Sequence, residues 1–212
     1  MRRIDVESWQ RKEHFNKYKD WTYPHLSLTA NVDITAYYPY VKQYEISVNV
    51  ATIYVLARTA NEIPEFRQRI RGNGVVEHEM VHPSSTIMTD DDLFSYCTFV
   101  YSKAFSGFNK HAVEQIKFVK ENRSLEDEPG RDDYLFMTAI PWVSFTNLMH
   151  PIDLKSVDSV PRIAWGKFFE VGERLKMPLS IQAHHGLIDG VHIGRYFEKV
   201  QDYLNQPEYL LM

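Results

Sequence analysis

The chain has a single cysteine, Cys97, so no intrachain disulfide can form. It also has no long apolar run. The longest, at about residues 50–57, is far shorter than the roughly 20 residues that span a bilayer. No apolar stretch follows the two arginines near the N-terminus, so we expect no secretory leader. These absences predict a cytoplasmic protein with no membrane partner.

The sequence also has fewer basic than acidic residues. The 24 Lys and Arg residues are outnumbered by 28 Asp and Glu residues, which gives a formal net charge of −4, and no long basic run is present. A nucleic-acid partner is therefore not expected, although a polyanionic small ligand would need only a local group of cations. Three consecutive carboxylates occur at Asp90–Asp92. Such a run in a turn is usually solvated, and we expect no metal site there.

The length and the pattern together indicate one globular domain. The 212 residues contain no linker, repeat or low-complexity tract, so we expect a single domain over 1–212. Aromatic residues make up 14% of the chain, enough to fill a core and to line a ligand pocket. Cys97 lies in an apolar, strand-like segment and is expected to be an inert core thiol.

Hydrophobic periodicity predicts a mixture of helices and strands without strict alternation. Period-two alternation predicts a strand over 26–34, and apolar spacing of three and four predicts a helix over 190–204. The other expected helices are 7–18, 38–61 with a break near 45–47, and the segment around 108–119. The other expected strands are two or three between 75 and 101, then 134–142, 162–171 and 178–184. This order favours an α+β fold, a two-layer sandwich in which helices pack against a mixed, largely antiparallel sheet.

Two further segments carry expectations of their own. The polar residues 121–133, which include a Pro-Gly pair, indicate a surface loop. His78 and His82 are four residues apart, a spacing that would place them together on a helix. The valines around them favour a strand instead, so we interpret both histidines as surface residues.

One segment, at residues 182–192, combines a junction between a predicted strand and a predicted helix with an unusual group of titratable side chains. It contains two adjacent histidines followed by Asp-Gly, in the run Gln182-Ala183-His184-His185-Gly186-Leu187-Ile188-Asp189-Gly190-Val191-His192. A His-His-x-x-x-Asp-Gly match arises by chance in roughly one chain in a thousand of this composition. Neighbouring residues on a strand point to opposite faces, so at most one of the two histidines can meet a given substrate. The other, His184, fits a structural imidazole.

This segment resembles the active-site signature of the chloramphenicol acetyltransferases, and the resemblance extends over nearly the whole chain. The matching motifs are Asp5-Val6 with Trp9-x-Arg11-Lys12-Glu13-His14-Phe15, then Ser27-Leu28-Thr29 with Val32-Asp33-Ile34-Thr35, Thr138-Ala139-Ile140-Pro141-Trp142-Val143-Ser144-Phe145, and Met177-Pro178-Leu179-Ser180-Ile181-Gln182 before the histidines. The resemblance implies an acetyl-CoA-dependent O-acetyltransferase of the antibiotic-resistance type. It further implies a small hydroxyl compound as acceptor, and a homotrimer with active sites at the subunit interfaces.

The resemblance also implies roles for individual residues. His185 takes the position of the general base, Asp189 pairs with Arg11, and Thr138 replaces the serine whose hydroxyl stabilises the oxyanion. The remaining residues are those expected near coenzyme A, Trp142 and Lys167, and those expected in the acceptor pocket, Tyr18, Leu26 and Ala164.

These assignments suit the chemistry of acyl transfer. A thioester carbonyl is already reactive, so what is required is an alcohol that loses its proton in the transition state. A histidine suits this role at neutral pH because its pKa lies near the working pH. The negative charge that develops on the carbonyl oxygen needs a donor, and a threonine hydroxyl can supply one.

Departures from the family pattern concern the acceptor. Leu26 and Ala164 stand where the resistance enzymes have a phenylalanine and a threonine, which predicts weak activity on chloramphenicol itself. Two alternatives stay open. The first is a catalytic domain like that of the dihydrolipoamide acyltransferases, which shares the His-x-x-x-Asp-Gly core. The second is a non-catalytic small-molecule-binding protein that kept the fold and lost turnover.

Overall fold

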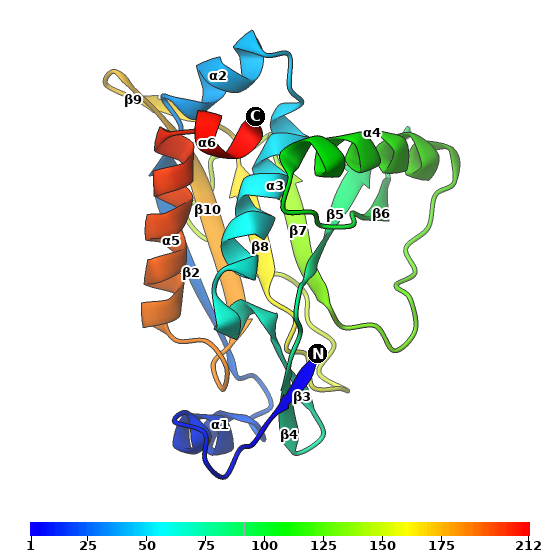
Figure 1. The fold of residues 1–212 in the computed structure, drawn as a ribbon, viewed down its shortest axis with the longest axis vertical. Coiled ribbons are helices and arrows are strands. Elements are labelled where there is room, and N and C mark those ends of the chain that lie inside the picture. Colours follow the sequence, from blue (N-terminus) through cyan, green and yellow to red (C-terminus); the bar gives the residue numbers. More distant parts are fainter. Residues whose placement is uncertain (91) are drawn as a thin grey trace.

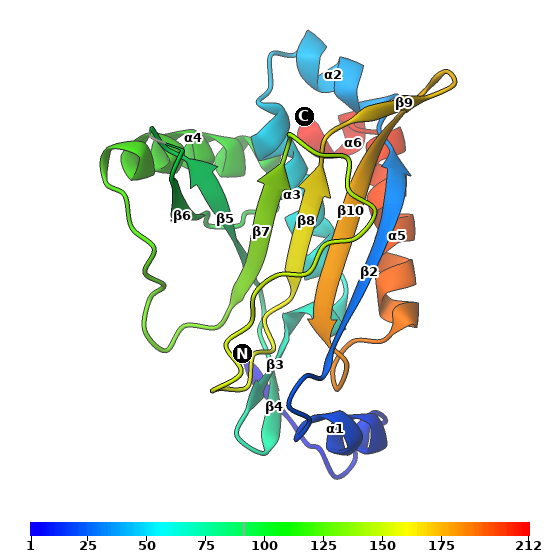
Figure 2. The same ribbon diagram turned by 180° about the vertical axis from the view of Figure 1, so that it is seen from behind.

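The computed structural model of the chain describes residues 1–90 and 92–212, and over these residues it has two layers (Figures 1 and 2). The main layer is a seven-stranded sheet in which the order is β2-β10-β8-β7-β5-β6, with β9 paired to one end of β10. The strands are β2 (His25–Asp33), β5 (His82–Met88), β6 (Phe94–Thr98), β7 (Tyr134–Ile140), β8 (Arg162–Gly166), β9 (Phe169–Val171) and β10 (Arg174–His184). β7 runs parallel to β5 and β8, and the other pairings are antiparallel.

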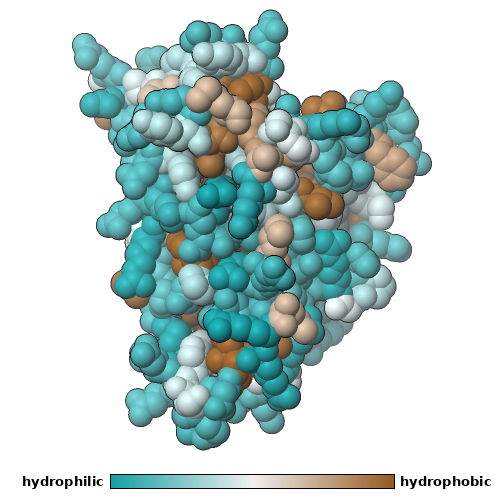
Figure 3. Space-filling view, in the orientation of Figure 1, coloured by the Kyte–Doolittle hydropathy of each residue, from teal (hydrophilic) through white to brown (hydrophobic). Residues whose placement is uncertain are grey.

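Helices cover one face of this sheet, the face seen in Figure 1. Three long helices make the cover: α3 (Val48–Asn61), α4 (Phe105–Glu121) and α5 (Gly190–Asn205). α5 is amphipathic as predicted, and it buries Ile193, Tyr196, Val200 and Leu204. The outer side of this layer is mostly hydrophilic (Figure 3). The α+β, two-layer prediction is confirmed.

Shorter elements complete the chain. A small sheet of order β1-β4-β3 lies at the end of the molecule near α1 (Figure 1). Its strands are β1 (Arg2–Ile4), β3 (Gln68–Arg71) and β4 (Gly74–Glu77), and the remaining helices are α1 (Lys12–Tyr18), α2 (Tyr37–Gln43), α6 (Glu208–Leu211) and the 3₁₀ helix η1 (Pro64–Arg67). The predicted break between α2 and α3 is confirmed. Ser47 caps α3 there by accepting the backbone N–H of Val50 at 3.4 Å.

The second face of the sheet is crossed by the long segment 141–161 rather than by helices (Figure 2). This crossing segment is fixed by polar side chains of the sheet. Ser27 donates its hydroxyl to the carbonyl of Leu148 at 2.9 Å, and the Gln182 side chain accepts the backbone N–H of His150 at 2.6 Å. Several of its apolar side chains stay exposed: Trp142, Val143, Met149, Leu154 and Val157 are each more than half accessible.

β10 is buried on both faces, and its alternating side chains show which site residues face the helices and which face the crossing segment. Leu179, Ile181 and Ala183 join the core under the helices, while Gln182 contacts the crossing segment on the other face. Leu26 lies opposite Ala183 and therefore faces the helices, whereas Ala164 lies opposite Ser180 and therefore faces the crossing segment. Leu26 and Ala164, two of the three predicted acceptor residues, thus point to opposite sides of the sheet.

Three local predictions are corrected by the structure. The helix expected over 7–18 begins only at Lys12, because the Asp5 carboxylate holds a turn by accepting from the Glu7 backbone N–H and the Ser8 hydroxyl. The strand expected over 134–142 ends at Ile140, and the one expected over 162–171 is divided into β8 and β9.

His78 is not a surface residue, contrary to the prediction. It is 9% exposed, and its Nε2 lies 2.9 Å from a carboxylate oxygen of Asp132, which reaches it from the 121–133 loop. His82 is also largely covered, and its Nδ1 accepts the backbone N–H of Tyr101. Burial lowers the pKa of both imidazoles. Contacts distant in sequence decide the burial here, which is why valine content alone misplaced them.

Cys97 is a core residue on β6, as expected. Its thiol is fully buried, and burial raises the pKa of that thiol to about 12. The predicted solvated acidic run is described only at Asp90 and Asp92, since Asp91 lies outside the described residues. Across the described part of the chain, no group of three or more His, Cys, Asp or Glu side chains is arranged to hold a metal ion, and no helix is long and apolar enough to cross a membrane.

Candidate active site

His185 lies just beyond the end of β10, in the turn that leads into α5. Its Nδ1 is 3.2 Å from the carbonyl oxygen of Ile188 and 3.2 Å from a carboxylate oxygen of Asp189. Both oxygens can only accept, so the neutral ring carries its proton on Nδ1 and keeps a lone pair on Nε2. The side chain is 34% exposed. The turn therefore presents an imidazole whose Nε2 is available as a base.

A two-point ion pair holds this turn to the N-terminal segment. The Arg11 guanidinium donates to both carboxylate oxygens of Asp189, at 2.6 and 2.9 Å, and to the carbonyl of His185 at 3.4 Å. The side chains are 13% and 23% exposed, so the pair is largely shielded from water. Hydrogen bonding from Arg11 holds the pKa of Asp189 below its ordinary value. The predicted partners meet, 178 residues apart in sequence.

Two predicted acceptor residues lie on the same side as His185. The Tyr18 ring stacks on the imidazole, with ring centroids 4.3 Å apart and an angle of 26° between the planes. Leu26 is partly buried against the core and pairs with Ala183, two residues before His185. We name Arg11, Tyr18, Leu26, His185 and Asp189 the histidine half-site.

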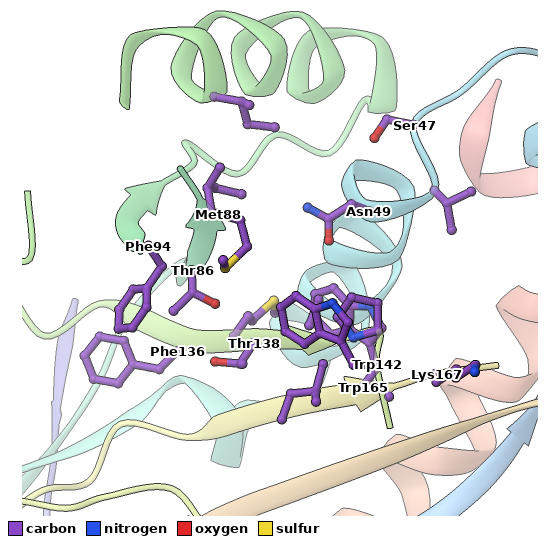
Figure 4. Close-up of a pocket in the computed structure, with 18 of the residues that line it drawn as sticks. Ser47, Asn49, Thr86, Met88, Phe94, Phe136, Thr138, Trp142, Trp165 and Lys167 are labelled. Carbon is purple, nitrogen blue, oxygen red and sulfur yellow. The ribbon is translucent and has the colours of Figure 1, made fainter. Parts of the chain in front are cut away.

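Three of the other predicted site residues line a cavity of about 1100 Å³ near the carboxyl end of β7 (Figure 4). Thr138, Trp142 and Lys167 line it, and the Trp142 side chain is 63% exposed. Thr138 pairs with Ala164, which is fully buried beside it in the sheet. We name these four residues the threonine half-site.

The sequence analysis missed an apolar wall on one side of Thr138. In Figure 4 the labelled side chains of Thr86, Met88, Phe94 and Phe136 gather on that side, and they come from three adjacent strands. β5, β6 and β7 meet only in the folded sheet, so one strand's alternation could not reveal this wall. The available sequence signal was a pair of aromatics two residues apart at 94 and 96, and a second such pair at 134 and 136.

The two half-sites are not brought together within one chain. Strand register places Gln182, Arg162 and Phe136 side by side. Thr138 lies two residues beyond Phe136, and His184 lies two residues beyond Gln182 in the opposite direction. Four strand steps and two strand spacings separate Thr138 from the histidine turn by roughly 16 Å, which is too far for both to act on the same atoms.

His184 occupies the structural role that was predicted for it. It is 2% exposed, and its Nδ1 accepts the backbone N–H of Gly186 at 3.1 Å. Burial lowers its pKa to about 4, so the ring stays neutral at neutral pH. A Cβ at Gly186 would lie 3.1 Å from the His184 ring, so the absence of a side chain there lets this imidazole pack under the turn.

Comparison with known proteins shows which family the sequence matches. The family described as chloramphenicol acetyltransferase matches residues 1–201. A chloramphenicol acetyltransferase from Klebsiella sp. is 31% identical over 206 residues, which is 96% of this chain and 93% of that protein.

Two solved acetyltransferase structures have a similar fold. A chloramphenicol acetyltransferase has a TM-score of 0.84 at 30% identity, over 95% of this chain and 98% of that chain. An Azotobacter vinelandii dihydrolipoamide acetyltransferase has a TM-score of 0.68 at 16% identity, over 99% and 90%, and this likeness extends to the fold alone. The chain therefore belongs to the chloramphenicol acetyltransferase family and is an acyltransferase.

Proposed function

We propose that the chain transfers an acetyl group from acetyl-CoA directly to a hydroxyl group of a small acceptor, with His185 as the general base. The observation that carries this proposal is the fixed tautomer of His185, because its Nδ1 faces the Ile188 carbonyl and leaves Nε2 free. Family membership supports the same reaction, since the relatives are named for acetyl transfer to chloramphenicol.

In the proposed reaction, Nε2 of His185 accepts the hydroxyl proton of the acceptor while the oxygen attacks the thioester carbonyl. The tetrahedral oxyanion accepts a hydrogen bond from the Thr138 hydroxyl. Cleavage of the C–S bond then returns the proton from His185 to the departing sulfur, so the enzyme is regenerated without a covalent acyl intermediate. Arg11 and Asp189 hold the imidazole in place throughout.

The threonine half-site suits acetyl-CoA in size and charge. Its cavity of about 1100 Å³ is slightly larger than the roughly 300–1,000 Å³ of ordinary ligand pockets, which suits a co-substrate as large as acetyl-CoA. Lys42, Lys120 and Lys167 line it and can meet the phosphates, while Trp142 offers an exposed ring for apolar contact. We propose these residues as the co-substrate side, with no metal taking part.

We further propose that each active site combines the histidine half-site of one subunit with the threonine half-site of another. The separation of roughly 16 Å within one chain supports this arrangement, because the reaction needs both groups on one carbonyl. The exposed apolar side chains of the crossing segment supply a surface that a second subunit can cover. A homotrimer is the assembly that the family resemblance implies.

Mixed oligomers test the shared site. Chains with His185→Ala and chains with Thr138→Ala are each expected to be inactive. If each site takes its histidine and its threonine from different subunits, random co-assembly restores about a quarter of the sites. Unfolding and refolding the two variants together should therefore regain activity that neither has alone. No regain from mixed oligomers, or a 25 kDa monomer in light scattering with full activity, would contradict the proposal.

Two broader proposals accompany this function. We propose that residues 1–212 form one domain, since a single core cluster extends from Phe15 to Leu211. We also propose a cytoplasmic location, because acetyl-CoA, the proposed co-substrate, is an intracellular metabolite. Limited proteolysis without a stable fragment would agree with the first proposal, and fractionation of the host cell tests the second.

The decisive assay is release of the coenzyme A thiol from acetyl-CoA with a panel of hydroxyl compounds. Turnover with any acceptor, lost in His185→Ala, supports the proposed reaction. Binding of acceptors without thiol release across the panel would favour a non-catalytic binding protein instead.

A further inference from the structure

His192 is a buried imidazole that the proposed reaction leaves unused. It lies in the first turn of α5 and is 6% exposed. Its Nδ1 is 2.9 Å from the backbone nitrogen of Asp189, and its Nε2 is 3.5 Å from a carboxylate oxygen of Glu65 in η1. The ring therefore connects a carboxylate on one side to the backbone of the active-site turn on the other.

The two partners of His192 determine where its proton lies. A backbone N–H can only donate, so Nδ1 must offer a lone pair to Asp189. The neutral ring then carries its proton on Nε2, facing Glu65, whose carboxylate can only accept. Glu65 favours the tautomer that the hydrogen bond to Asp189 requires. Burial also lowers the pKa of His192, which keeps the ring neutral at neutral pH.

The N–H that His192 accepts and the carbonyl that binds His185 belong to the same peptide unit, the one joining Ile188 to Asp189. Peptide units are planar, so fixing the direction of the N–H fixes the direction of the carbonyl oxygen. That oxygen, together with the Asp189 carboxylate oxygen that also lies 3.2 Å from Nδ1, favours the Nδ1–H tautomer of His185 and leaves Nε2 as the base. Hydrogen bonds on both sides of one peptide also polarise each other.

We propose that Glu65 and His192 are positioning residues, which act through the Ile188–Asp189 peptide to hold His185 in its base-competent tautomer. This inference rests on the proposed function, in which His185 is the base. The Arg11–Asp189 ion pair holds the side chain of Asp189, whereas His192 and Glu65 hold its backbone. The two supports are therefore distinct.

The charges around His192 determine the response to pH. Glu65 and Asp189 favour the protonated ring, whereas burial, Arg11 and Arg195 disfavour it. Protonation would place a hydrogen on Nδ1, against the N–H of Asp189, and would release the peptide. Removing the acceptor at position 192 should therefore lower turnover at pH 7, as protonation of His192 is expected to do at lower pH.

Matched variants separate positioning from simple packing. Glu65→Gln keeps an oxygen that can accept from Nε2, while Glu65→Leu does not. His192→Asn keeps a side-chain oxygen that can accept from Asp189, while His192→Ala does not. We expect His192→Ala to lower kcat roughly three- to tenfold, the size of one lost hydrogen bond, with KM for acetyl-CoA unchanged. Glu65→Leu removes the longer contact of 3.5 Å and should lower kcat less, again with KM unchanged. The conservative changes Glu65→Gln and His192→Asn should retain most of the wild-type kcat.

The control is Glu198→Leu, which changes an exposed carboxylate on α5 and should leave kcat unaltered. Melting temperatures are recorded for every variant. Equal losses in the conservative and non-conservative variants, or losses that follow the melting temperature rather than the acceptor atom, would assign Glu65 and His192 to packing alone and overturn the proposal.

Ring-nitrogen NMR of ¹⁵N-histidine-labelled protein gives a test that needs no turnover. At pH 7 the wild type should show His192 with its proton on Nε2 and His185 with its proton on Nδ1. Glu65→Leu should give mixed tautomers at His192 and a smaller Nδ1–H population at His185, where the Asp189 carboxylate still faces Nδ1. A doubly protonated or Nδ1–H His192 overturns the positioning role even in an active enzyme. The expected tautomers in a protein without acetyl transfer would leave this role intact and reject the proposed function.

Discussion

The Arg11–Asp189 ion pair gives the sharpest test of how the histidine turn is held. Asp189→Asn keeps the shape of the side chain and removes its charge, and Arg11→Met keeps much of the length. Each change leaves the other charge in a site where the two side chains are only 13% and 23% exposed. Arg11→Met removes both short hydrogen bonds to Asp189, at 2.6 and 2.9 Å, whereas Asp189→Asn keeps one accepting oxygen and removes the charge. In either variant the remaining charged group recovers little from water.

The magnitude follows from this partial burial. Breaking a fully buried pair costs about 3–5 kcal/mol, while an exposed pair contributes at most about 1 kcal/mol. The Arg11–Asp189 pair lies between these limits but nearer the buried one, so each single change should destabilise folding by about 2–3 kcal/mol. Since the second change removes the charge that the first one orphaned, the double variant should lose about 1.5 kcal/mol less than the sum.

Chemical denaturation of the four proteins in the double-mutant cycle measures this coupling. Effects of Arg11→Met and Asp189→Asn that add to within about 0.5 kcal/mol would show no coupling and would refute the reasoning. The pH dependence gives a second check. Because the pKa of Asp189 is lowered in the folded state, the contribution of the pair is present above the unfolded-state pKa of about 4 and is lost as pH falls through the lower, folded-state value.

Three further predictions concern the site. His185→Ala should lower turnover about 10²–10⁴-fold with acetyl-CoA binding nearly unchanged, whereas His184→Ala should act mainly on the melting temperature; unchanged turnover in His185→Ala would reject it as the base. Gly166→Ala should destabilise the protein by about 1–3 kcal/mol and disturb the crossing segment, because the added Cβ would lie 2.7 Å from both the Val143 carbonyl oxygen and Pro178 Cγ. A melting temperature equal to that of the wild type would contradict this prediction. Chloramphenicol should be a poor acceptor, with kcat/KM reduced about ten- to a hundredfold, because Leu26 replaces a phenylalanine ring and Ala164 replaces a threonine hydroxyl. A measured kcat/KM near the roughly 10⁷–10⁸ M⁻¹s⁻¹ of a highly evolved enzyme would show that these substitutions were over-interpreted.

Local patterns predicted much of the fold. The amphipathic spacing of α5 and the alternation of β2 depend on neighbours in the chain, so both elements were found with nearly correct bounds. The start of α1 was misplaced, because the side chain of Asp5 competes for the backbone donors that a helix would use. His78 was misplaced because its partner, Asp132, is 54 residues away.

The candidate site was likewise predicted only in part. The ion pair between Arg11 and Asp189 was predicted by the family resemblance, and the structure brings those residues together. The distance between Thr138 and His185 could not be foreseen, because it depends on the register of three strands. The role of Glu65 carries no local signal either, since only the folded chain brings η1 against the first turn of α5.

The burial of Cys97 has a practical consequence for every experiment on this protein. Cys97 is the only thiol in the sequence, it is fully covered, and burial raises its pKa to about 12, so almost none of it is thiolate at neutral pH. A thiol-reactive dye can therefore follow coenzyme A release continuously without modifying the enzyme. A cysteine introduced at the surface would also be the one reactive handle, which makes the wild-type chain a ready background for attaching a single fluorophore to either half-site.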